Sequence, residues 1–173
     1  MRDVSGINLR ETQLFADLAQ LGIAFELVEH DAVFTVEESA KLNRDIPGSH
    51  TKNLFLKDAG GQFWLVTVPA EMRVDLKNLP QAIGCKRVSF AKADDMIRLL
   101  GISPGSVTPL AAINDTGRDV SIAIDASLAA RDRINVHPLR NTATIGLSPA
   151  NLIQLLNYWR HIPVIATIPS MGS

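Results

Sequence analysis

The strongest constraint on the fold lies between residues 53 and 69, where a glycine-containing turn separates two apolar segments. NLFLKD precedes AGG, and QFWLVTVP follows it. Two such segments joined by a few residues that include glycine are typical of a β-hairpin. The sequence therefore predicts an antiparallel strand pair in the middle of the chain.

The elements around this hairpin do not alternate regularly between strand and helix. Capping patterns and apolar spacing predict helices that begin at Asn8, Thr35 and Ser148, and KADDMIRLLG is a further helix. VDLKNLPQAIG is predicted as a helix that Pro80 breaks, and ISPGSVTPLAAIND as a loop running into a strand. IAFELVEH, KRVSF, DVSIAID, INVHPL and TATIGLS are predicted short strands. This mixed order predicts an α/β fold with a strongly curved mixed β-sheet flanked by helices.

Length and composition narrow the class of protein. The 173 residues suit a single domain spanning 1–173, and a chain of this length buries a sufficient core without metal or disulfide support. Cys85 is the only cysteine and the four histidines are scattered, so we expect no disulfide, no metal site and no cofactor. Neither a signal peptide nor a membrane span is apparent, and a cytoplasmic location fits best.

The charge is unevenly distributed, although the net charge is only −1. Residues 1–48 carry a net charge of −5, whereas residues 49–92 carry seven Lys and Arg against three Asp and Glu, a net charge of +4. The overall value argues against a protein that binds nucleic acid over a large surface. The basic middle is either a local anion-binding surface or an ordinary solvated face.

Four short segments hold residues suited to chemistry, and each has a plain structural explanation as well. HTKN opens the first hairpin strand, where Lys52 and Asn53 point to opposite faces, and a lysine there is either a ligand or a solvated side chain. GSVTP provides a glycine turn whose backbone N–H groups converge on an oxyanion, or it is an ordinary loop. His137 in NVHPL lies at a strand end as a site residue or a structural histidine. NDTGRD is explained by a hairpin turn.

Taken together and in order, these segments resemble one protein family. HTKNLFLKD, GSVTPLAAIND and NVHPLRNTATIGLS are similar to segments of the YbaK/ProX family of aminoacyl-tRNA deacylases, which are related to the editing domain of bacterial prolyl-tRNA synthetase. The likeness spans nearly the whole chain, and it implies the family's fold, a mixed, barrel-like β-sheet flanked by helices. It is greatest to the branch called ProXp-ala or PrdX, which removes alanine from tRNA(Pro).

The resemblance implies an enzyme that hydrolyses the ester between a wrong amino acid and the 3′ end of a tRNA, without a metal or other cofactor. It implies tRNA as a partner, with prolyl-tRNA synthetase as a second candidate partner. Lys52, Gly105 and His137 match the family's catalytic positions, and Asn53 matches a substrate-binding position. The remaining substrate-binding candidates are Ser106, Val107, Thr108, Pro109, Ala111, Ala112, Ile113 and Ile145.

These roles are chemically reasonable because an aminoacyl ester is already activated. A positioned water and a few donors aimed at the developing oxyanion suffice for hydrolysis, so a strong nucleophile is not essential. We expect Lys52 to pair with a phosphate or ribose oxygen, the 105–109 loop to hold the ester carbonyl, and His137 to orient the ribose or the water.

Two alternatives stay open at the level of sequence. The amino acid removed is alanine, or it is another small residue such as cysteine, serine or threonine. The other alternative is a non-catalytic module that keeps the fold and binds tRNA or a protein.

Overall fold

The predicted hairpin is the centre of the structure. In a computed structural model that describes residues 9–32 and 36–172, β2 (Ser49–Asp58) pairs antiparallel with β3 (Phe63–Pro69). The side chains of β3 alternate between two apolar clusters, Leu65 on one face of the sheet and Trp64 and Val66 on the other. This alternation follows from the two-residue period of a strand, and it makes both faces of the hairpin apolar.

The hairpin lies within an eight-stranded mixed sheet in which the strand order is β1-β7-β6-β2-β3-β5-β8, with β4 paired to β2. The pairs β2–β6, β3–β5 and β5–β8 are parallel, and the other pairs are antiparallel. The remaining elements are α1 (Leu9–Gln20), β1 (Glu26–Glu29), α2 (Val36–Asp45), α3 (Leu79–Ile83), β4 (Val88–Phe90), α4 (Ala93–Leu100), η1 (Pro104–Ser106), η2 (Pro109–Asn114), β5 (Val120–Asp125), α5 (Ala126–Ala129), β6 (Ile134–Val136), β7 (Ala143–Leu147), α6 (Pro149–Tyr158) and β8 (Val164–Ala166).

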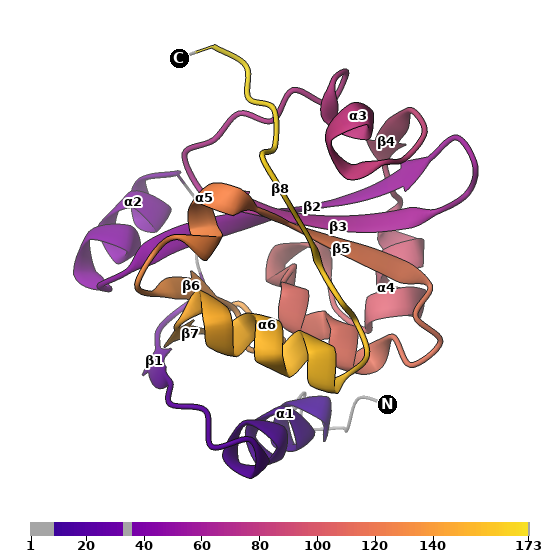
Figure 1. Ribbon diagram of the computed structural model, residues 1–173. Helices are drawn as coiled ribbons and strands as arrows, with labels where there is room; N and C mark the ends of the chain where they lie inside the picture. Colours follow the sequence, from indigo (N-terminus) through magenta and orange to yellow (C-terminus); the bar gives the residue numbers. More distant parts are fainter. Residues whose placement is uncertain (1–8, 33–35, 173) are drawn as a thin grey trace.

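Helices cover both faces of the central strands. Figure 1 shows α3 on one side of β2, β3 and β5, and α1 and α6 on the other. The larger apolar cluster joins α1, α4, η2 and α6 to the sheet, and the smaller one joins α3 and Ile168 to the opposite face. The expected α/β class, with a mixed sheet flanked by helices, is confirmed.

Two predicted elements differ from the structure. Pro80 does not break a helix, because α3 starts at Leu79 and places Pro80 in the first turn, where its missing N–H has no intrahelical partner to lose. Residues 109–114 form the 3-10 helix η2 rather than a strand. Thr108 begins it by accepting a hydrogen bond from the Leu110 N–H, and Pro109 suits its first position.

The remaining predictions have mixed outcomes. The last helix begins as expected, with the Ser148 hydroxyl accepting from the Asn151 N–H, and NDTGRD connects η2 to β5 instead of joining two paired strands. The predicted helix starts at Asn8 and Thr35 lie outside the described residues.

Candidate active site

A cavity of about 260 Å³ opens where the start of β2 meets β6, β7 and the end of α2. This volume lies just below the roughly 300–1,000 Å³ of sites for drug-sized ligands, so it suits a small group. Its lining combines polar and apolar side chains: Leu42, Ile46, His50, Thr51, Lys52, Asn53, Ala70, Asn135, Val136, His137 and Thr144.

The polar residues at the start of β2 have different roles. His50 and Thr51 make structural contacts, whereas the Lys52 side chain forms no such contact with the described residues. His50 Nε2 lies 3.1 Å from the Ile46 carbonyl oxygen, and the Thr51 hydroxyl donates to the Asn135 carbonyl oxygen at 2.6 Å. Both contacts fasten the loop before β2 and the parallel pairing with β6. Lys52 is half-buried on the cavity wall, and its ammonium group forms no ion pair with the residues that the structure describes. That ammonium group is therefore available to a ligand.

Asn53 connects the cavity to the 105–109 loop. Its Nδ2 group donates to the Val107 carbonyl oxygen at 3.1 Å, and its Oδ1 atom accepts from the Thr67 hydroxyl at 2.6 Å. Both ends of the amide are thus engaged with the protein. Asn53 fixes the position of the loop relative to β2 and β3.

None of the residues in the 105–109 loop lines the cavity. The loop is connected to the cavity through Asn53, which bonds to Val107. Gly105 is exposed, and a side chain built there would come within 3.4 Å of Asn141 Nδ2. The Ser106 N–H donates to the Ser103 carbonyl oxygen, so that N–H is not one of the expected converging donors. Thr108 is buried and begins η2.

The apolar residues that sequence reasoning assigned to the substrate pocket lie elsewhere. Ala111, Ala112, Ile113 and Ile145 are buried in the larger apolar cluster. The 3-10 turn of η2 directs its residues into that core, which the prediction of an extended segment did not anticipate. The apolar wall of the cavity consists instead of Leu42, Ile46, Ala70 and Val136. Leu42 and Ile46 lie one helical turn apart at the end of α2, whereas Ala70 follows β3 and Val136 ends β6. Three segments that are distant in the sequence therefore form this wall.

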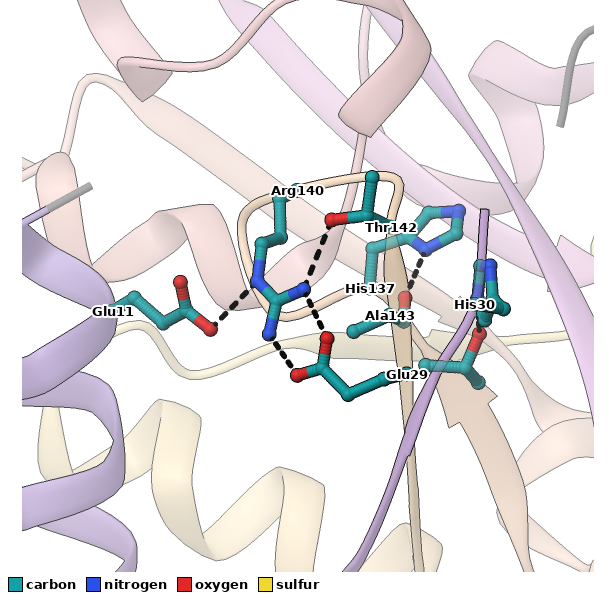
Figure 2. A network of polar contacts seen from close by, with 8 residues as sticks. Glu11, Glu29, His30, His137, Arg140, Thr142 and Ala143 are labelled. Atoms are coloured by element: carbon teal, nitrogen blue, oxygen red, sulfur yellow. Dashed lines mark hydrogen bonds and ion pairs between the residues drawn. The ribbon is translucent and has the colours of Figure 1, made fainter. Parts of the chain in front are cut away.

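His137 follows β6 and faces the cavity. Its Nδ1 lies 2.9 Å from the Ala143 carbonyl oxygen, as Figure 2 shows. Because a carbonyl oxygen only accepts, Nδ1 carries the proton of the neutral ring and Nε2 presents a lone pair. No described residue bonds to Nε2. Burial is the main cause that lowers the pKa of His137; nearby His30 lowers it further, whereas the bond to Ala143 opposes the shift.

His30 lies next to His137 but does not line the cavity. The two ring centroids are 6.5 Å apart (Figure 2). His30 Nδ1 lies 2.8 Å from the Asp31 carbonyl oxygen, and His30 Nε2 lies 2.9 Å from the Thr144 hydroxyl oxygen. Sequence reasoning did not select His30, because the residues that it contacts in β7 are more than a hundred positions away.

Neither a metal-binding cluster nor a membrane-spanning helix is present among residues 9–32 and 36–172. No group of three or more His, Cys, Asp or Glu side chains in these ranges is arranged to hold a metal ion. The described helices also include none with the length and apolarity that crossing a membrane requires.

Comparisons with known proteins agree with this fold. The model of the aminoacyl-tRNA editing domain family matches residues 30–155. The chain is 37% identical to the prolyl-tRNA editing protein ProX of Acetoanaerobium sticklandii, over 83% of this chain and 88% of that protein. It is 36% identical to the prolyl-tRNA synthetase associated domain-containing protein 1 of Bos taurus, over 94% and 96%.

More distant similarities extend the comparison. The multifunctional Ser/Thr-tRNA deacylase ProXp-y of Escherichia coli K12 is 29% identical over 63% of this chain and 67% of its own length. A solved structure described as a candidate trans-editing enzyme for prolyl-tRNA synthetase superposes with a TM-score of 0.71 at 18% identity, covering 96% of this chain and 99% of that one. That structure supports the fold alone.

These matches show that the protein has the fold of an editing domain. The chain belongs to the aminoacyl-tRNA editing domain family, and the YbaK/ProX resemblance is confirmed.

Proposed function

We propose that this protein is a trans-acting hydrolase that removes alanine from tRNA(Pro). As a member of its family it is an aminoacyl-tRNA deacylase with tRNA as its substrate; the amino acid and the tRNA are the proposal. The observation that supports it best is the meeting of Lys52 and His137 on one small cavity, with His137 Nε2 available as an acceptor.

The reaction begins with the attack of water on the ester carbonyl carbon, which forms a tetrahedral oxyanion. The bond to the ribose oxygen then breaks, and this oxygen takes up a proton in exchange for the one that the water loses, which leaves free alanine and a tRNA with its 3′-terminal hydroxyl restored. Lys52 supplies the positive charge that fixes the 3′ end beside this centre and stabilises negative charge on it. His137 Nε2 accepts a hydrogen bond from the attacking water or the ribose hydroxyl and so orients it. The Gly105 turn is held by Asn53 through Val107 and lies outside the cavity lining, so its contact with the carbonyl oxygen stays a prediction.

Selection of alanine rests on the apolar wall of the cavity. Leu42, Ile46 and Val136 surround a small volume, and Ala70 adds no bulk. One methylene group that merely fits is worth only about 1–3 kcal/mol, so exclusion of larger side chains by contact is the effective sieve. We expect contact with this wall to exclude proline, the correct product of the synthetase, when the ester lies beside Lys52 and His137.

Serine or threonine is the second candidate amino acid. The similarity to a protein named as a Ser/Thr-tRNA deacylase favours it. The Thr144 and Thr51 hydroxyls already bond to His30 and Asn135, so they are poor partners for a substrate hydroxyl. Deacylation of tRNA(Pro) charged in turn with alanine, serine, threonine, cysteine and proline separates the candidates. We expect alanine to be released at least tenfold faster than the others, and preferential release of serine or threonine would overturn the proposal.

Synthesis of aminoacyl-tRNA takes place in the cytoplasm, and we propose that the protein acts there. Prolyl-tRNA synthetase is a candidate partner, since it recognises tRNA(Pro) and would present the mischarged product.

The pH dependence of the reaction follows from His137. Its pKa is lowered below the ordinary 6.5, chiefly by burial, so the ring stays neutral down to that pH. We expect the single-turnover rate constant, after subtraction of uncatalysed hydrolysis, to be constant from about pH 8 to about pH 6.5. It should decline only below about pH 6.5, where His137 becomes protonated. A rate that increases as the pH falls through this range would contradict a neutral His137.

Salt dependence tests how much of the tRNA the protein contacts. With a net charge of −1 and a basic segment confined to residues 49–92, few phosphates are neutralised. The association constant for tRNA(Pro) without an amino acid can be measured by fluorescence anisotropy at several salt concentrations. We expect the slope of the logarithm of this constant against the logarithm of salt concentration to be no steeper than about −3. A slope near −8 would show an extended tRNA surface instead.

A further inference from the structure

The loop that carries His137 is held from outside by a single arginine. This loop, residues 137–142, joins β6 to β7. Leu139 lies at its tip with a positive φ of 72°, and its side chain is buried in the larger apolar cluster. A leucine rarely adopts this backbone conformation, so the surrounding contacts must maintain it.

Arg140 forms hydrogen bonds with three side chains around it (Figure 2). Nε donates to Glu11 in α1 at 2.9 Å, and the two terminal nitrogens donate to the two oxygens of Glu29 in β1 at 2.8 and 2.5 Å. Nη1 also donates to the Thr142 hydroxyl at 2.9 Å. The planar guanidinium group suits this arrangement because its donors form a rigid fork that matches a carboxylate.

These contacts lead directly to His137. Arg140 donates to the Thr142 hydroxyl. The Thr142 carbonyl oxygen accepts a hydrogen bond from the backbone N–H of His30. The next residue, Ala143, provides the carbonyl oxygen to which His137 Nδ1 donates. Arg140 thus fixes the segment that determines which nitrogen of His137 faces the cavity. On the other side of the loop, Asn141 lies against Gly105.

We propose that Arg140, clamped between Glu11 and Glu29, is a positioning residue for deacylation, because it holds the loop in which Ala143 orients His137. This inference rests on the proposed function of His137. It assigns to α1 and β1 a share in the active-site geometry, although neither element lines the cavity.

The charged groups near His137 come from several elements, and they determine what happens when the clamp is removed. His30 lies behind the ring, Lys52 and His50 line the same cavity, and Arg140 with Glu29 holds the loop. Without the clamp, we expect water to enter around the ring. Because burial is the main cause that lowers the pKa of His137, that pKa should rise toward 6.5.

The test compares Arg140→Ala with Arg140→Lys and with Arg98→Ala as a matched control. Arg98 forms an exposed ion pair with Asp95 and lies outside the cavity. Single-turnover deacylation should lose at least tenfold in rate constant for Arg140→Ala, with a dissociation constant for tRNA within twofold of wild type. Arg140→Lys, which keeps the charge but not the fork, should recover only part of the rate, and Arg98→Ala should equal wild type.

A second readout separates positioning from mere stability and does not need the activity. The ring ¹⁵N and ¹H shifts of His137 report its tautomer and its pKa, and the melting temperature reports the fold. In folded Arg140→Ala, we expect a mixture of tautomers and a higher pKa. An unchanged His137 titration and tautomer in folded Arg140→Ala would overturn the proposal. A wild-type protein without deacylase activity, but with these spectral changes in the variant, would overturn the proposed function and leave the clamp standing.

Discussion

Lys52→Ala is expected to lower the single-turnover rate constant for deacylation by about 10²- to 10³-fold. Loss of one group that stabilises the oxyanion typically costs about 3–4 kcal/mol of transition-state stabilisation. Lys52 is the cavity cation that no described acidic side chain pairs with, so its removal leaves the site without that charge. The measurement uses enzyme in excess over charged tRNA, so that binding and chemistry are separated.

The matched control is Lys57→Ala on the same strand. Lys57 is exposed, and its Nζ atom lies 5.3 Å from the centre of the Phe63 ring, away from the cavity. We expect this variant to keep wild-type activity. Lys52→Arg should retain part of the rate, since it keeps the charge with a different shape. A folded Lys52→Ala variant with a rate within twofold of wild type would rule out Lys52 as the anchor of the substrate.

His161→Ala is expected to lower the free energy of unfolding by about 3–5 kcal/mol. His161 Nε2 lies 3.0 Å from Asp115 Oδ2, and both side chains are buried. His161 Nδ1 also faces an acceptor, the Trp159 carbonyl oxygen at 3.1 Å. Removing the imidazole leaves the buried Asp115 carboxylate with only the Asp119 and Val120 N–H groups as donors among the described residues and without its side-chain partner, which is a severe change in a protein interior.

Urea unfolding at pH 7, followed by circular dichroism, measures this loss. Arg98→Ala is again the control, because it breaks an exposed pair and should cost less than about 1 kcal/mol. An equally small loss for His161→Ala would show that the buried pair adds little to the fold.

The same pair predicts how stability depends on pH. Burial alone would raise the pKa of Asp115, but hydrogen bonds from His161 and from the Val120 and Asp119 N–H groups outweigh it and lower that pKa. A lowered pKa in the folded state means that Asp115 stabilises the fold above about pH 4, its ordinary range, and that this contribution is lost as the pH falls further.

Local patterns in the sequence predicted the elements, and long-range contacts determined the site. The β2–β3 hairpin and α6 follow from an apolar period, a glycine turn and a serine cap, all of which act over a few residues. Lys52 and His137 lie 85 positions apart, and the parallel pairing of His50 with Asn135 brings them together. No local signal specifies that register, so only the family resemblance predicted their proximity.

Long-range packing also explains why three of the predicted pocket residues lie in the core. Ala111, Ala112 and Ile113 follow the 105–109 loop directly, but the 3-10 turn of η2 buries them in the core. The clamp of Arg140 joins residues 129 and 111 positions away, and a pair of glutamates at such distances has no pattern in the sequence. Residues that hold a site from outside its lining are therefore the hardest to predict.

The most direct measurement is the time course of hydrolysis of Ala-tRNA(Pro) and Pro-tRNA(Pro) by the same preparation, at equal enzyme concentration. Our account predicts rapid release of alanine, no acceleration of proline release above the uncatalysed rate, and loss of the alanine reaction in Lys52→Ala. Release of both amino acids at similar rates, or of neither at micromolar enzyme, would contradict it.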